Sequence, residues 1–257
     1  MTAAPPVAVV QVAMDDEAAP FLDRATEVAE PETVGRAVYR RITLAGRPVV
    51  LVRSGVGFVA ATAAATGVIL HHGTGVPLIS AGSVGGLAKG VAVGDVVLAT
   101  HLVNANADAR AFGYVLGQVP GMPPMYEADP ALAEAVRRAA SAGVPAGAAD
   151  GPAAPGSVLR EGTIGSGERF VTTDLAAQLR VDFPDMLAVD MESAALGQLC
   201  HSFGTPFVSV RAVSDLCAPD GTEFLTHIDD AAERSARLVT AVIADLADAR
   251  PHPFASA

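Results

Sequence analysis

The stretch LAVDMESAALGQLC, residues 187–200, contains the junction that decides the fold. Its first three residues are apolar and predict the end of a buried strand, whereas SAALGQLC predicts a helix. Two acidic residues, Asp190 and Glu192, lie between these segments. A strand that passes directly into a helix is typical of α/β proteins, and acids at such a junction can cap the helix or bind a ligand.

The same alternation of short apolar runs and Ala-rich helical patterns continues along the chain. Strands are predicted at 7–13, 76–82, 95–103, 156–167 and 206–214, with a hairpin at 41–52 that turns at Ala45 and Gly46. Helices are predicted at 16–28, 58–72, 130–143, 172–179, 192–203 and 229–248. Strands separated by helices imply largely parallel pairing with both sheet faces covered.

Hairpin-like segments at 41–52 and 95–120 indicate that the sheet is mixed. We therefore expect an α/β protein with a central mixed, partly barrel-like β-sheet flanked by helices on both faces. One domain is expected over residues 1–257, with flexible termini at 1–6 and 250–257. The Gly-, Pro- and Ala-rich stretch 141–156 is expected to be a surface loop.

Composition and charge narrow the functional class. A formal net charge of −11 argues against nucleic acid or an anionic membrane as a partner, because both require basic patches. A small nucleoside stays possible, since it has no phosphate to neutralise. The N-terminus lacks the basic region of a signal peptide and predicts a first strand instead. With two cysteines in no metal-ligand spacing, we expect free thiols, no metal and a cytoplasmic location.

Polar residues gather where four predicted strands end, in the segments 13–17, 80–87, 189–193 and 210–215. Ligands of α/β sheets bind at the carboxyl ends of strands. Each segment also has a structural explanation: Glu17 and Glu192 suit helix N-termini, and Asp215 could cap a helix or pair with Arg211. The turn AGSVGG lacks the features of a phosphate loop or a nucleophile elbow.

The combination of these segments carries more information than any one of them. Three carboxylates, a Gly-Ser turn, Phe170 and Met191 can together surround a ribosylated base. Cleavage of an N-glycosidic bond passes through a cation-like sugar. It requires one acid to protonate the departing base, one carboxylate to activate water and one to bind the sugar hydroxyls.

Taken in order, the segments form a set that resembles a known family. They are AMDDE, SGVG, AGSVGGLAKGVAVGDVV, AFGYVLGQVPGMP, SGERFV, VDMESAA and CHSFGTPFVSVRAVSD. Over residues 7–248 the chain resembles the bacterial 5′-methylthioadenosine/S-adenosylhomocysteine nucleosidases of the purine nucleoside phosphorylase/uridine phosphorylase superfamily. The resemblance implies hydrolysis of 5′-substituted adenosines, a nucleoside substrate, no cofactor and a homodimer with sites near the interface.

The resemblance also implies a role for each matching residue. Glu17 corresponds to the base that activates water, and Asp215, held by Ser214, to the acid that protonates the purine at N7. Glu192 corresponds to the carboxylate that binds the ribose hydroxyls. The other positions that match the family's substrate site are Val56, Ser83, Phe170, Val171, Met191, Arg211 and, for the 5′ group, Phe224. Those matching the segment that reaches into the neighbouring subunit are Phe112, Tyr114 and Pro120.

The chain departs from the family pattern at a few positions. Residues 104–108 read NANAD where His-Asp-Ala-Asp is common. Arg169 stands where a small residue is more usual, after Glu168 rather than Asp, and the loop 141–156 is longer than expected. These departures concern the dimer edge and the pocket for the 5′ group more than the chemistry.

Three alternatives to this function stay open. An aminodeoxyfutalosine nucleosidase would share the purine site and differ at the 5′ pocket. A phosphorylase of the same fold would need cations after the first strand and after the glycine turn, where this chain has Asp15, Asp16 and Glu17, and Gly86 and Leu87. A non-catalytic nucleoside-binding protein would not require the three carboxylates.

Overall fold

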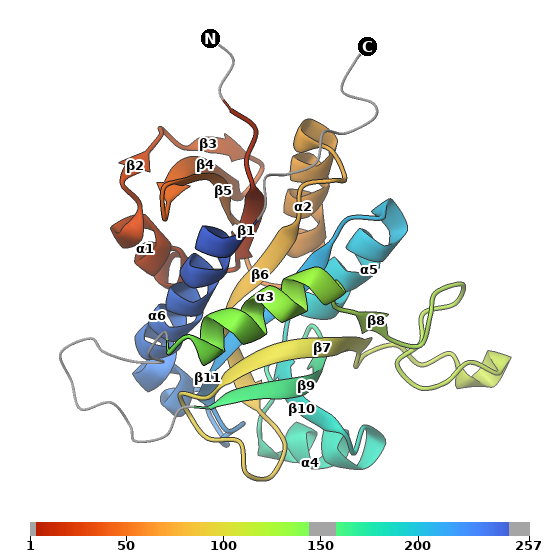
Figure 1. Ribbon diagram of the computed structural model, residues 1–257. Coiled ribbons are helices and arrows are strands. Elements are labelled where there is room, and N and C mark those ends of the chain that lie inside the picture. Colours follow the sequence, from red (N-terminus) through yellow and green to blue (C-terminus); the bar gives the residue numbers. More distant parts are fainter. Residues whose placement is uncertain (1–3, 144–157, 247–257) are drawn as a thin grey trace.

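The computed structural model describes residues 4–143 and 158–246, in which eleven strands form a mixed sheet with helices on both sides (Figure 1). The strands are β1 (Ala8–Val12), β2 (Glu27–Val28), β3 (Glu32–Val34), β4 (Ala37–Leu44), β5 (Arg47–Arg53), β6 (Leu78–Gly86), β7 (Val96–Asn104), β8 (Tyr126–Glu127), β9 (Leu159–Ser166), β10 (Met186–Asp190) and β11 (Phe207–Asp215). The helices are α1 (Asp15–Arg24), α2 (Phe58–His72), α3 (Pro130–Ser141), α4 (Thr173–Asp182), α5 (Ser193–Phe203) and α6 (Thr222–Asp245), with a 3₁₀ turn at Arg110–Phe112.

Part of the sheet closes on itself. β10 pairs in parallel with β9 and antiparallel with β6, and β6 leads through β11 and β7 back to β9. From β6 the sheet also continues outward through β1, β5 and β4. The expected mixed, partly barrel-like sheet of an α/β protein is therefore confirmed.

The core is divided between the two faces of this sheet. Val10 and Val12 of β1 pack with α1, α3 and α6, whereas Val9 packs with α2 and α5. This division follows from the strand geometry, because successive side chains point to opposite faces. All five residues of β1 are buried and four of them are apolar, as expected of a strand covered on both faces; the fifth, Gln11, donates a hydrogen bond to the Ala61 carbonyl at 2.9 Å.

Local chemistry explains several element boundaries. Ala45 and Gly46 both have positive φ, 50° and 73°, as a two-residue hairpin turn requires, and the predicted hairpin is confirmed. The predicted helix 16–28 is wrong at its end: α1 stops at Arg24, and residues 27–28 pair with β4 instead.

Two further boundaries differ from the sequence prediction. The final helix begins at Thr222 rather than 229, and the Asp220 carboxylate accepts a hydrogen bond from the amide of this first residue at 2.9 Å. β7 pairs antiparallel with β11 and with β8, and both of these strands lie beyond the predicted hairpin segment 95–120. Most of the predicted loop 141–156 and the outermost residues of both predicted flexible termini lie outside the described residues. Among the helices of residues 4–143 and 158–246, none is long and apolar enough to cross a membrane.

Candidate active site

A cavity of about 240 Å³ lies at the carboxyl ends of β1, β6, β10 and β11. It is lined by every candidate that the sequence assigned to a single subunit: Glu17, Val56, Ser83, Phe170, Val171, Met191, Glu192, Arg211, Ser214, Asp215 and Phe224. The four strands bring together residues that are up to about two hundred positions apart in the chain. The cavity is therefore the candidate active site.

Glu17 lies on the first turn of α1 and is 1% exposed. Its Oε2 accepts hydrogen bonds from the amides of Ala13 and Met14, at 2.8 and 3.2 Å. Its Oε1 accepts from the amide and the hydroxyl of Ser83, at 2.8 and 2.9 Å. All four partners are donors, so the end of β1 and the glycine turn of β6 together fix this carboxylate at the cavity wall.

Gly82 allows this close approach between β6 and α1. A Cβ atom at Gly82 would lie 2.2 Å from Oε1 of Glu17, and the backbone there has a φ of +129°. The turn AGSVGG does not have the pattern of a phosphate loop. Its glycine at position 82 is instead required because any side chain there would collide with the Glu17 carboxylate.

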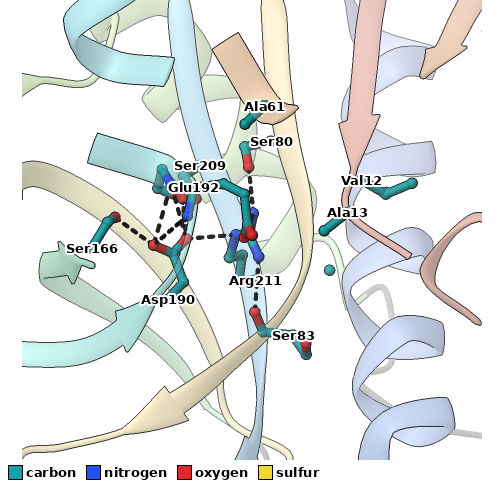
Figure 2. A network of polar contacts seen from close by, with 12 residues as sticks. Val12, Ala13, Ala61, Ser80, Ser83, Ser166, Asp190, Glu192, Ser209 and Arg211 are labelled. Carbon is teal, nitrogen blue, oxygen red and sulfur yellow. Dashed lines mark hydrogen bonds and ion pairs between the residues drawn. The ribbon is translucent and has the colours of Figure 1, made fainter. Parts of the chain in front are cut away.

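Arg211 lies at the centre of a buried polar network (Figure 2). Its guanidinium donates to the Ser83 carbonyl at 3.0 Å and to the Ser80 hydroxyl at 2.9 Å. Its Nη2 lies 3.2 Å from Oε2 of Glu192, and its Nε lies 2.9 Å from Oδ2 of Asp190, too misaligned for a hydrogen bond. The positive charge is therefore shared between two carboxylates.

Asp190 and Glu192, the two acids of the opening stretch, have different surroundings. Asp190 accepts from the Ser166 and Ser193 hydroxyls, and from the Ser193 amide at the start of α5. Glu192 accepts from the Gly57 amide at 2.9 Å. Burial raises the pKa of Glu192, and the charge of Arg211 opposes that shift. Asp190, at the end of β10, thus binds β9 through Ser166 and the start of α5 through Ser193. Glu192 instead binds the amide at the N-terminus of α2.

Asp215 ends β11 and is 5% exposed. Its Oδ1 accepts from the Cys217 amide and its Oδ2 from the Ser214 hydroxyl, both at 2.9 Å. Arg211 pairs with other acids, so the Arg–Asp pair considered from the sequence is not formed here. Burial raises the pKa of Asp215, and the two hydrogen bonds offset part of this shift. A carboxyl group with a raised pKa can serve as a general acid.

Apolar side chains line the rest of the cavity. The rings of Phe170 and Phe224 meet edge to face with their centroids 5.8 Å apart, although one follows β9 and the other lies on α6. Val56 precedes α2 and is 48% exposed, and Met191 lies between the two acids. Flat and apolar walls of this kind suit an aromatic base.

Phe112, Tyr114 and Pro120 do not line this cavity. They belong to the segment between β7 and β8, which projects away from the sheet (Figure 1). Phe112 is 83% exposed. Within a single chain, the structure therefore does not bring these residues to the other candidates.

Sequence reasoning missed several residues of the cavity wall. They are Ala13, Met14, Val84, Gly85, Val189 and Cys217; Asp190, which the sequence assigned to the fold, and Arg169, which it noted as a departure from the family, line the cavity as well. Most flank a candidate directly in the chain, which is the signal that could have found them. Cys217 lies outside the strands and has a positive φ of 59°, which is uncommon for a residue other than glycine. Burial raises the pKa of its thiol to about 12, so the thiol is a poor nucleophile.

Comparison with known proteins places the chain among relatives of the same length. The sequence model of the phosphorylase superfamily matches residues 7–244. A 5′-methylthioadenosine/S-adenosylhomocysteine nucleosidase of Geobacillus kaustophilus is 36% identical over 233 residues, which are 90% of this chain and 94% of the relative. One from Actinobacillus succinogenes is 37% identical over 83% of this chain and 88% of its own.

Solved structures agree with the sequence comparison. The nucleosidase of the same name from Neisseria meningitidis, in complex with methylthio-immucillin-A, is 36% identical with a TM-score of 0.84 and covers 93% of this chain and 99% of its own. The futalosine hydrolase of Helicobacter pylori is 26% identical with a TM-score of 0.81, over 93% of this chain and 99% of its own. The chain therefore belongs to the phosphorylase superfamily and, within it, to the family of 5′-methylthioadenosine/S-adenosylhomocysteine nucleosidases.

Proposed function

We propose that this protein hydrolyses the N-glycosidic bond of 5′-substituted adenosines, such as 5′-methylthioadenosine, S-adenosylhomocysteine and 5′-deoxyadenosine, and releases adenine. The observation that carries the proposal is the convergence of Glu17, Glu192 and Asp215 on one cavity with Phe170 and Met191. The names of the relatives support the same substrate class.

The reaction is proposed to begin at the base. Asp215 donates its proton to N7 of adenine, and the bond between C1′ and N9 breaks with its electron pair moving into the base. The ribosyl group that remains has the character of a cation, which the negative charge of Glu192 favours. Water then adds to C1′ while Glu17 takes its proton, so the products are adenine and a 5-substituted ribose.

The two catalytic carboxyl groups have different surroundings, as this chemistry needs. Glu17 accepts four hydrogen bonds, an arrangement suited to the ionised form that takes a proton from water. Asp215 has a pKa raised by burial, which suits the protonated form. Opposed protonation states of two carboxyl groups are a recurrent solution for acid and base catalysis at one site.

Hydrolysis is favoured over phosphorolysis by the charges at the cavity. Its wall carries the acids Glu17, Asp190, Glu192 and Asp215, and Arg211 is already paired with two of them. A phosphate nucleophile in place of the proposed water would lie beside the Glu17 carboxylate, where Arg211 is already shared between two acids; the wall's other cation, Arg169, is on an exposed side chain. We therefore propose water as the nucleophile.

The experiment that tests this function is adenine release by the purified protein, with and without phosphate, from adenosines that differ only in the 5′ group. The expected result is release from 5′-methylthioadenosine at a rate independent of phosphate. Formation of a ribose 1-phosphate, or a rate that rises with phosphate, would show a phosphorylase. No adenine from any of these compounds would indicate a nucleoside-binding protein, and release only from aminodeoxyfutalosine would indicate that alternative.

Substitution of Gly82 by alanine is expected to lower kcat/KM by about 10²-fold or more, because the new Cβ would displace the Glu17 carboxylate. The matched control is Gly90→Ala, at a glycine whose φ is also positive, +85°, but whose Cβ would meet nothing within 4 Å. Steady-state kinetics of both variants check the prediction. An equal change of kcat/KM in the two variants would assign the effect to backbone strain alone.

We also propose a homodimer in which Phe112, Tyr114 and Pro120 of one subunit reach the cavity of the other. Apolar side chains on the surface support this arrangement, because Phe112 is 83%, Val59 of α2 is 79% and Leu70 of α2 is 74% exposed. Light scattering is expected to give twice the 26.0 kDa of one chain. A monomeric mass with full activity would contradict the proposed completion of the site.

A further inference from the structure

Arg169 is an unpaired cation on the wall of the cavity. Its side chain is exposed, and it makes no hydrogen bond or ion pair with any residue in the two described ranges, 4–143 and 158–246. The other cation of the wall, Arg211, is buried and shared between Asp190 and Glu192. In a chain with a net charge of −11, Arg169 is therefore a positive charge available to a ligand in the cavity.

The neighbours of Arg169 along the chain contact two parts of the cavity wall. On one side, Oε1 of Glu168 accepts a hydrogen bond from the Phe58 amide at 2.9 Å, two residues after Val56. On the other side, the ring of Phe170 contacts that of Phe224. Val56 and Phe224 line the cavity, and the resemblance assigns Val56 to the substrate site and Phe224 to the 5′ group. The backbone of Arg169 is therefore flanked by residues that contact two parts of the cavity wall, and its side chain is free to reach a 5′ substituent there.

We propose that Arg169 determines specificity by favouring adenosines whose 5′ substituent carries a carboxylate. This inference rests on the proposed function. A guanidinium can bind a carboxylate through two parallel hydrogen bonds, which a neutral thioether cannot form. The acids that line the same cavity would otherwise disfavour an anionic substrate, so a cation at the mouth would offset their effect.

Two classes of substrate share this chemistry. An amino-acid carboxylate ends the 5′ thioether of S-adenosylhomocysteine, and an aryl carboxylate ends the 5′ group of aminodeoxyfutalosine. Arg169 is proposed to bind the carboxylate that these two 5′ groups share. Comparison of kcat/KM for these two compounds then distinguishes the sources.

The test uses a matched pair of adenosines that carry a 2-carboxyethylthio group or its carboxamide at the 5′ position. The measured quantity is the ratio of kcat/KM for the acid over that for the amide. We expect a ratio of about ten for the unmodified protein, since charge-assisted hydrogen bonds near solvent have effects of this order. The ratio should fall to about one in Arg169→Ala and below one in Arg169→Glu.

Lys89→Ala provides the matched control, because Lys89 is also an exposed cation but does not line the cavity. Its ratio should equal that of the unmodified protein. Added salt should reduce the preference of the unmodified protein and leave that of Arg169→Ala unchanged. Equal ratios in all four proteins would overturn the inference, even if adenine is released from both compounds. Absence of adenine release from every compound would instead overturn the proposed function.

Discussion

Asp215→Asn is expected to lower kcat for adenine release by about 10²–10⁴-fold, because an amide cannot donate the proton that N7 must receive. The substitution keeps the shape of the side chain: the Asn oxygen can still accept from the Cys217 amide, and its NH2 group can donate to the Ser214 hydroxyl, which reverses its role. The fold should therefore persist. Adenine release measured under single-turnover conditions checks the prediction, with Asp229→Asn, at an exposed position on α6, as the control of equal charge change.

The pH dependence provides an independent readout of the same residue. Burial raises the pKa of Asp215, so its protonated form persists to higher pH than that of an exposed aspartate. Activity should decrease as pH rises through this raised pKa, because the proton donor is lost. The residual activity of Asp215→Asn should lack that decrease. Near-normal kcat in the variant would show that another group protonates the base.

Glu17→Gln is expected to reduce kcat by a similar factor of about 10²–10⁴, because the amide cannot take a proton from water. This variant should also be less stable. Whichever way the amide is turned, its nitrogen faces backbone donors, either those of Ala13 and Met14 or that of Ser83. Each buried donor left without an acceptor costs about 1–3 kcal/mol. Kinetics and urea unfolding together check both effects.

Glu127→Gln is the control for Glu17→Gln, since Glu127 is exposed and does not line the cavity. It should leave both kcat and the free energy of unfolding close to those of the unmodified protein. A Glu17→Gln variant that kept more than about a tenth of kcat would mean that a different group activates the water.

The sequence brought the candidate residues together because several of them lie at the ends of strands. Glu17 follows β1, Glu192 follows β10 and Asp215 ends β11, and all three line one cavity, so their positions at strand ends were visible in the sequence. Their catalytic roles came from the resemblance to the family and stay predictions. The hairpin at Ala45 and Gly46 was equally accessible, since the turn depends only on local backbone geometry.

Other features depended on register and could not be predicted. Which acids pair with Arg211 depends on how β11 and β10 are each aligned with β6. No local sequence pattern encodes this alignment. The need for glycine at residue 82 arises from the Glu17 carboxylate, more than sixty residues away in the chain. The end of α1 at Arg24 was missed because pairing with β4 competes with helix propensity there.

The most direct test of the central claim is a crystal structure of the protein with a non-hydrolysable 5′-methylthioadenosine analogue. We expect the analogue in the cavity, with the Asp215 carboxyl group within about 2.6–3.2 Å of the atom at the N7 position. A water molecule should lie between Glu17 and the C1′ position. An analogue bound elsewhere, such as in the second cavity beside Tyr39 and His72, or one turned so that Asp215 faces the sugar, would contradict it.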